Sequence, residues 1–156
     1  MMFDHFFKTQ TNSKQEITLL GKKQQKHVVR LEADQTIEYF ELDKIIKPCN
    51  KTIQNLKACD YVLADHSRKR LLFCELKNSQ NRGVIKGAKT QLDHSKHIVN
   101  LFLNIFEKNK YSYALLVLHT KKMNKRTTKT RPIQQEKYID SNQKEFDFNK
   151  LVYAQN

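Results

Sequence analysis

The sequence predicts an α/β fold in a single domain, and three features of its central part support this prediction. Residues 59–64 and 71–77 are mostly apolar and flank the polar segment 65–70, as in an antiparallel hairpin. Apolar residues then recur at helical spacing over 84–108, and a short apolar run follows at 113–118. Because parallel strands need a long crossover connection, we expect strand, helix and strand to form one right-handed unit.

The N-terminal part gives weaker signals. Residues 1–25 are polar after the opening aromatic residues and keep no period of 2 or 3.6, so we expect a loosely ordered lead-in. The domain itself should span residues 26–156, with a basic loop at 120–131.

Residues 28–31 and 37–42 have strand-like patterns on either side of a turn at 33–35, which predicts a second hairpin. A helix over 36–46 is the alternative, because Thr36 is a residue type that caps helices and the apolar positions are partly at helical spacing.

Composition excludes several classes of protein. The three cysteines are an odd number without CxxC spacing, which argues against a disulfide framework or a zinc knuckle. No apolar run approaches the ~20 residues that span a bilayer. Asp4 and His5 interrupt the place where a signal peptide would be apolar, so we expect a soluble, cytoplasmic protein without a membrane partner.

The net charge of +13 comes from 29 Lys and Arg against 16 Asp and Glu, and it implies an anionic partner such as nucleic acid. Six cations without an intervening acid or aromatic residue gather in the basic loop, where we expect them to contact phosphates: Lys121, Lys122, Lys125, Arg126, Lys129 and Arg131.

A candidate reaction centre lies on the central hairpin. A hairpin centred between Ser67 and Arg68 places Asp60 opposite Glu75, on the same face of the sheet. Strand alternation puts Lys77 on that face as well. Two carboxylates can hold Mg2+, and a nearby ammonium can stabilise charge during phosphodiester hydrolysis. The alternative is an ordinary ion pair at a strand end, worth about 0 to 1 kcal/mol.

Asp60, the hairpin and Glu75-Leu76-Lys77 together resemble the PD-(D/E)xK nuclease superfamily, which includes restriction endonucleases and Holliday junction resolvases. Gln91 on the long helix resembles the glutamine that several of these nucleases carry. The resemblance covers residues 59–118 and implies a restriction endonuclease-like core, with a central mixed four-stranded sheet flanked by helices.

The same resemblance implies Mg2+ or Mn2+ as cofactor, Asp60 and Glu75 as metal ligands, and Lys77 and Gln91 as further catalytic residues. Cys59 stands where the family motif has proline. The acidic residue that the first helix of the family often contributes has three possible matches here, Glu32, Glu38 and Glu41.

We therefore expect a metal-dependent endonuclease that hydrolyses phosphodiester bonds in DNA. A homodimer or a partner subunit would supply the two centres that cutting two strands requires. The alternatives are an RNA nuclease of the same fold and a non-catalytic nucleic-acid-binding module.

Overall fold

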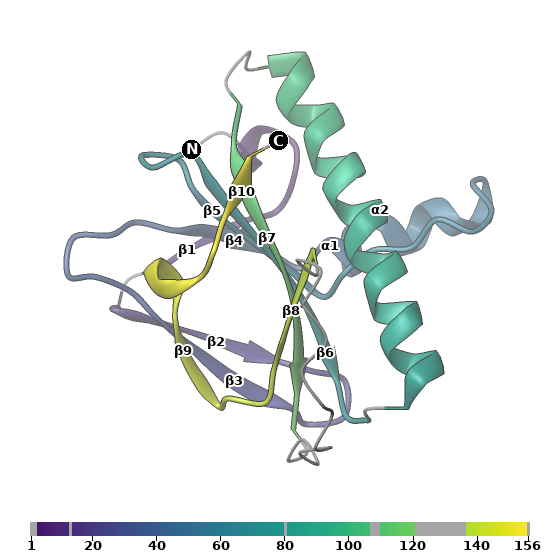
Figure 1. The fold of residues 1–156 in the computed structure, drawn as a ribbon. Helices are drawn as coiled ribbons and strands as arrows, with labels where there is room; N and C mark the ends of the chain where they lie inside the picture. The colour runs from purple at the N-terminus through teal and green to yellow at the C-terminus, as the bar shows by residue number, and fades with distance from the viewer. Residues whose placement is uncertain (1–2, 13, 80, 107–109, 121–136, 156) are drawn as a thin grey trace.

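The computed structural model describes residues 3–12, 14–79, 81–106, 110–120 and 137–155. They form two β-sheets and a long helix that packs on one face of the larger sheet (Figure 1). No helix in these ranges is long and apolar enough to cross a bilayer. The six cations between positions 121 and 131 lie outside the described residues, so their predicted role stays a prediction.

The larger sheet has seven strands, in the order β1, β4, β5, β6, β7, β10, with β8 also paired to β7. The pairs β6–β7 and β7–β8 are parallel, and the other pairs are antiparallel. The strands are β1 (Gln10–Thr11), β4 (Glu38–Phe40), β5 (Tyr61–Asp65), β6 (Arg70–Lys77), β7 (Ser112–His119), β8 (Tyr138–Ser141) and β10 (Ala154–Gln155).

A mixed sheet within an α/β fold is thus confirmed, whereas the expected number of four strands is wrong. β1 and β10 have two residues each and β8 has four, which is too short to show a period of 2 in the sequence. Their pairing partners are distant in the chain, so tertiary packing rather than local pattern makes them strands.

The central hairpin of β5 and β6 forms as predicted, with Tyr61 opposite Cys74 and Asp65 opposite Arg70. All residues from Leu71 to Leu76 are buried. Such a strand, apolar on both faces, has to be covered on both sides.

Helix α2 (Arg82–Phe106) connects β6 to the parallel strand β7, which confirms the predicted crossover. Its buried apolar side chains pack in one cluster with residues of β6 and β7; they are Ala88, Leu92, Val99 and Leu103. Figure 1 shows the helix running the length of one face of the larger sheet.

The opposite face of the larger sheet is covered by a three-stranded sheet of β2 (Glu16–Leu20), β3 (Lys26–Arg30) and β9 (Glu145–Asp147). Ile17, Leu19 and Val29 pack there with Leu72 and Leu116. The structure thus has sheet on one face of β6 and helix on the other, so the expectation that helices flank the sheet holds for one face only.

The predicted pairing of residues 28–31 with 37–42 is wrong. β3 pairs with β2 and β9, while β4 pairs with β1 and β5. The two segments therefore belong to different sheets. A strand-like pattern identifies a segment that can bury one face, but it does not identify the partner strand.

The prediction of a loosely ordered lead-in at the N-terminus is also wrong for the part that the structure describes. Residues 3–12 and 14–20 contribute the 3-10 helix η1 (Phe3–His5), β1 and β2. Phe3 and Phe7 are buried beside Phe40, with ring centroids 5.3 and 5.0 Å from it. These aromatic side chains extend the core on the α2 side, and burial of that area gives the segment a fixed place.

Neither interpretation of residues 36–46 describes the whole range. The segment divides into β4 and the short helix α1 (Leu42–Ile46), which continues into the 3-10 helix η2 (Lys47–Lys51). Leu42 and Ile46 are buried and hold α1 on the core. Asp43 lies in the first turn of α1, close to the start of β5, because its N–H donates to the Cys59 carbonyl at 3.1 Å.

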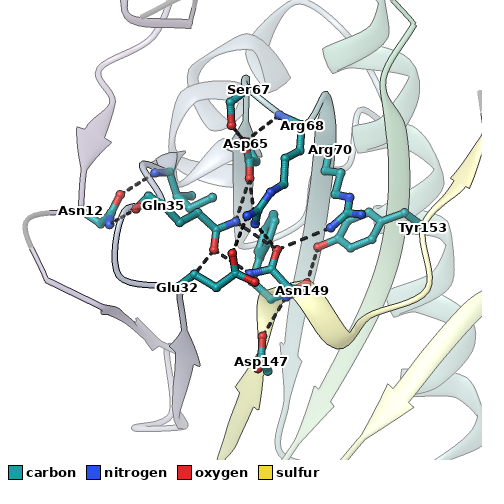
Figure 2. Close-up of polar contacts among 12 residues, drawn as sticks. Asn12, Glu32, Gln35, Asp65, Ser67, Arg68, Arg70, Asp147, Asn149 and Tyr153 are labelled. Carbon is teal, nitrogen blue, oxygen red and sulfur yellow. Dashed lines mark hydrogen bonds and ion pairs between the residues drawn. The ribbon is translucent and has the colours of Figure 1, made fainter.

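A polar cluster anchors the turn between β5 and β6 (Figure 2). The fully buried Asp65 carboxylate accepts hydrogen bonds from Ser67 Oγ at 2.6 Å, the Arg68 N–H at 3.0 Å and Gln35 Nε2 at 2.7 Å. Gln35 also exchanges amide hydrogen bonds with Asn149, which lies in the 3-10 helix η3 (Phe148–Lys150). Two distant segments, one around Gln35 and the other η3, thereby fix the turn end of the hairpin, and Asp60 and Glu75 lie at its other end.

Candidate active site

The hairpin register brings Asp60 and Glu75 together. Asp60 directly precedes β5, and the pair Tyr61–Cys74 makes Asp60 and Glu75 the next opposed positions. The Asp60 N–H donates to Glu75 Oε2 at 3.1 Å, and Asp60 Oδ2 accepts from the Leu76 N–H at 2.8 Å. The predicted opposition of the two acids is therefore confirmed.

Lys77 and Gln91 join this pair. Lys77 Nζ donates to Glu75 Oε1 and, at 2.9 Å, to Gln91 Oε1. Gln91 Nε2 donates in turn to the Ala58 carbonyl at 3.1 Å, which sets the orientation of the amide. The four side chains expected to form the site thus lie in one hydrogen-bonded group, with α2 supplying Gln91 across the end of β6.

The surroundings of Asp60 and Glu75 disfavour the ionised form of both carboxyl groups. Glu75 is 1% exposed, and burial followed by the charge of Asp60 raises its pKa to about 7, although Lys77 opposes this shift. Burial also raises the pKa of Asp60, against the hydrogen bond from Leu76. Two neighbouring carboxylates in such a place gain from a cation that neutralises them.

The acids open into a pocket of about 290 Å³. It is lined by Lys77 at the end of β6, by Asn78 directly after that strand and by Gln91 of α2. Lys22 and Lys23 line it from the turn between β2 and β3. A larger hollow of about 620 Å³ lies over α2 and Tyr138, but neither Asp60 nor Glu75 borders it. The pocket at the hairpin end is therefore the one that Asp60 and Glu75 both line, together with amines and amides.

The three acids considered as a first-helix ligand lie elsewhere. Glu32 pairs with Arg68, Glu38 with His66, and Glu41 with Lys44 at 2.8 Å. The acid of the first α-helix near the site is instead Asp43, whose charge contributes to the raised pKa of Asp60. The helical interpretation of residues 36–46 contained this residue, but the sequence pattern alone did not place it beside Asp60.

Two lysines near the acids were not foreseen either. Lys22 Nζ lies 2.5 Å from Asp43 Oδ2, and the charges of Asp60 and Glu75 also act on it. Lys22 and Lys23 come from the segment that was expected to be loosely ordered. Because the sequence is rich in lysine, nothing in it distinguishes Lys22 and Lys23 from the other lysines.

The carboxylate oxygens of Asp60 and Glu75 are ligands of the type that hard divalent cations bind. Asp60 and Glu75 offer carboxylate oxygens from adjacent positions, and Mg2+ sites in proteins commonly use one or two carboxylates, with water and substrate phosphate as the other ligands. Over the described parts of the chain, no group of three or more His, Cys, Asp and Glu side chains is arranged as a metal site.

Comparison with protein-family models, with curated proteins and with solved structures finds no match to this chain. Its function is consequently inferred from the geometry of the site and from the motif.

Proposed function

We propose that this protein is a metal-dependent nuclease that hydrolyses phosphodiester bonds in DNA, with Asp60, Glu75, Lys77 and Gln91 as its active site. The observation that carries the proposal is the hydrogen-bonded group itself. Two carboxylates are held side by side where ionisation is unfavourable, with an amine and an oriented amide bound to them. An ordinary strand-end ion pair needs one acid and has no use for the second.

The proposal includes the restriction endonuclease-like core. The hairpin β5–β6, the crossover helix α2 and the parallel strand β7 follow the order of that motif, and Glu75 and Lys77 lie at the end of β6. In this interpretation the additional short strands and the three-stranded sheet are elaborations around that core.

Each residue has a task that its contacts support. Asp60 and Glu75 would hold Mg2+ or Mn2+, and a bound ion supplies charge neutralisation and an activated water. Lys77 Nζ can donate to a phosphate oxygen on which negative charge develops. Gln91 keeps Lys77 beside Glu75, because its amide is fixed by the Ala58 carbonyl.

The net charge of +13 supports a polyanionic substrate, and the predicted phosphate contacts of the segment 121–131 would add to it. The chain offers no known base-reading module, so we propose that DNA structure, a homodimer or a partner subunit sets the specificity.

The test is cleavage by purified protein of supercoiled plasmid, branched DNA and RNA, with Mg2+, Mn2+ or chelator. We expect metal-dependent cleavage of DNA, and linear rather than nicked plasmid would indicate paired centres. Lys77→Ala should lower the single-turnover rate by ~100-fold or more while the circular dichroism spectrum stays unchanged.

Lys14→Ala is the matched control, because Lys14 is exposed and does not border the pocket. Cleavage of RNA alone would change the substrate. Lys77→Ala activity above about a tenth of the wild-type rate would remove Lys77 from the mechanism, since catalytic groups of this kind supply factors of ~100 or more. Absence of cleavage with either metal would leave a nucleic-acid-binding module.

A further inference from the structure

The turn between β2 and β3 reaches the pocket of the proposed active site from the second sheet. Lys22, Lys23 and Gln25 line the pocket together with Asp60 and Glu75. None of these three has a task in the mechanism above. Their position places two amines at the edge of a pocket whose other wall carries the acids.

The turn has a fixed backbone. The Gly21 N–H donates to the Gln25 carbonyl at 2.8 Å, and the Gln24 N–H donates to the Gly21 carbonyl at 3.2 Å. Gln24 has a φ of 61°, in the left-handed region. Such a hydrogen-bonded turn fixes the backbone positions from which the Lys22 and Lys23 side chains extend.

The buried Gln25 side chain also stabilises this turn. It is 5% exposed, and its Oε1 accepts a hydrogen bond from the Lys23 N–H at 2.9 Å. A Cβ atom on residue 21 would lie 2.2 Å from that oxygen, so the close approach requires glycine at position 21. The backbone of Lys23 is therefore held by a buried side chain.

The charges around Lys22 indicate what it could bind. Its ammonium group contacts Asp43, and 76% of its side chain is exposed, so the pair is accessible to an anion. The lysine end of this ion pair is exposed to solvent, so a phosphate can compete with the carboxylate for the ammonium group. Lys23 is exposed and adjacent.

We propose that Lys22 and Lys23 form a phosphate clamp, which holds the DNA backbone across the pocket from Lys77, and that Lys22 leaves Asp43 to make this contact. The inference rests on the proposed nuclease function and names the residues that position its substrate. Lys77 acts on the reacting phosphate, whereas the clamp acts on binding.

The first experiment measures duplex DNA binding by fluorescence anisotropy over a range of KCl concentrations, with chelator present so that no cleavage occurs. Each phosphate contact that is lost should flatten the plot of log affinity against log salt by about 0.9. We expect Lys22→Gln/Lys23→Gln to flatten it by about 1.8 and Lys23→Gln alone by about 0.9. Lys26→Gln, from the same hairpin but outside the pocket, should leave it unchanged.

Asp43 provides a test of the exchange. Asp43→Asn should tighten DNA binding severalfold in the wild type, because Lys22 is released, and should do so much less in Lys22→Gln. If Asp43→Asn weakens binding, or tightens it equally in both backgrounds, Lys22 does not exchange partners and the proposal is overturned.

Gly21→Ala tests the turn while keeping both charges. We expect it to weaken binding at unchanged circular dichroism, because the added methyl group displaces Gln25 and with it the Lys23 backbone. Salt slopes of the lysine variants equal to that of Lys26→Gln would overturn the clamp even if the wild type cleaves DNA. Changed slopes without cleavage by the wild type would instead support the clamp and refute the nuclease function.

Discussion

Asp60 and Glu75 are connected through the backbone as well as opposed across the hairpin. The Asp60 N–H donates to Glu75 Oε2 at 3.1 Å, and the Leu76 N–H donates to Asp60 Oδ2 at 2.8 Å. The hairpin therefore holds two like charges at close range, where burial and mutual repulsion raise the pKa of Glu75 and burial raises that of Asp60. In the protein alone this arrangement costs stability, and a bound cation would recover it.

Replacing Glu75 by glutamine should make the stability of the metal-free protein less dependent on pH. The pKa of Glu75 is raised from 4.5 to about 7, so the folded state retains a proton that the unfolded state releases between these values. Stability from this group is therefore full below pH 4.5 and is lost as the pH rises through about 7. A glutamine amide cannot ionise and so does not lose this stability. The free energy of unfolding of Glu75→Gln, relative to that of the wild type, should therefore increase by up to about 3 kcal/mol from about pH 5 to about pH 8.

Urea unfolding at both pH values in the presence of chelator measures this gain. Glu16→Gln serves as the control, because Glu16 is exposed on β2 and its replacement should change the free energy of unfolding by no more than about 0.5 kcal/mol. An equal effect of Glu75→Gln at both pH values would show that Glu75 does not hold its proton in the folded state.

Asp65 should be a major source of stability for the hairpin. Burial alone would raise its pKa, but hydrogen bonds from Ser67, the Arg68 N–H and Gln35 outweigh it and lower the pKa below the ordinary value. Asp65→Asn replaces an acceptor oxygen by a donor that faces other donors, so it should cost about 2 to 4 kcal/mol in urea unfolding. Glu145→Gln, which breaks the exposed ion pair with Arg30, should cost less than about 1 kcal/mol. Similar costs for the two variants would mean that the buried cluster does not hold the turn.

The central elements could be predicted because their signals are local. The strands β5 and β6 lie next to each other in the chain, so the turn between them determines their register. Residues 82–106 show helical periodicity over many turns, and the following apolar run can only be a buried strand or helix segment. Asp60, Glu75, Lys77 and Gln91 all belong to this stretch, which is why the sequence could place them together.

The remaining parts depend on distant partners. Ile17 and Leu19 are buried against residues of β5 and β6, and Phe3 contacts Phe40, far apart in the sequence. No local pattern contains this information. Lys22 and Asp43 reach the surroundings of the acids through the same long-range packing, so they were missed, although the residues with a local signal were not.

Metal binding by the two acids should be visible in thermal unfolding. Mg2+ or Mn2+ should raise the melting temperature of the wild type, because a ligand that binds only the folded state stabilises it by mass action. At a concentration of about 100 times Kd the gain would be about 2.7 kcal/mol, or several degrees for a domain of this size. Asp60→Asn and Glu75→Gln each remove an oxygen ligand and should show a smaller increase, even if Glu75→Gln melts at a higher temperature without metal. Glu145→Gln should respond like the wild type, since Glu145 lies in β9 and outside the pocket. If both site variants gain as much from the metal as the wild type does, the cation binds elsewhere and Asp60 and Glu75 are not its ligands.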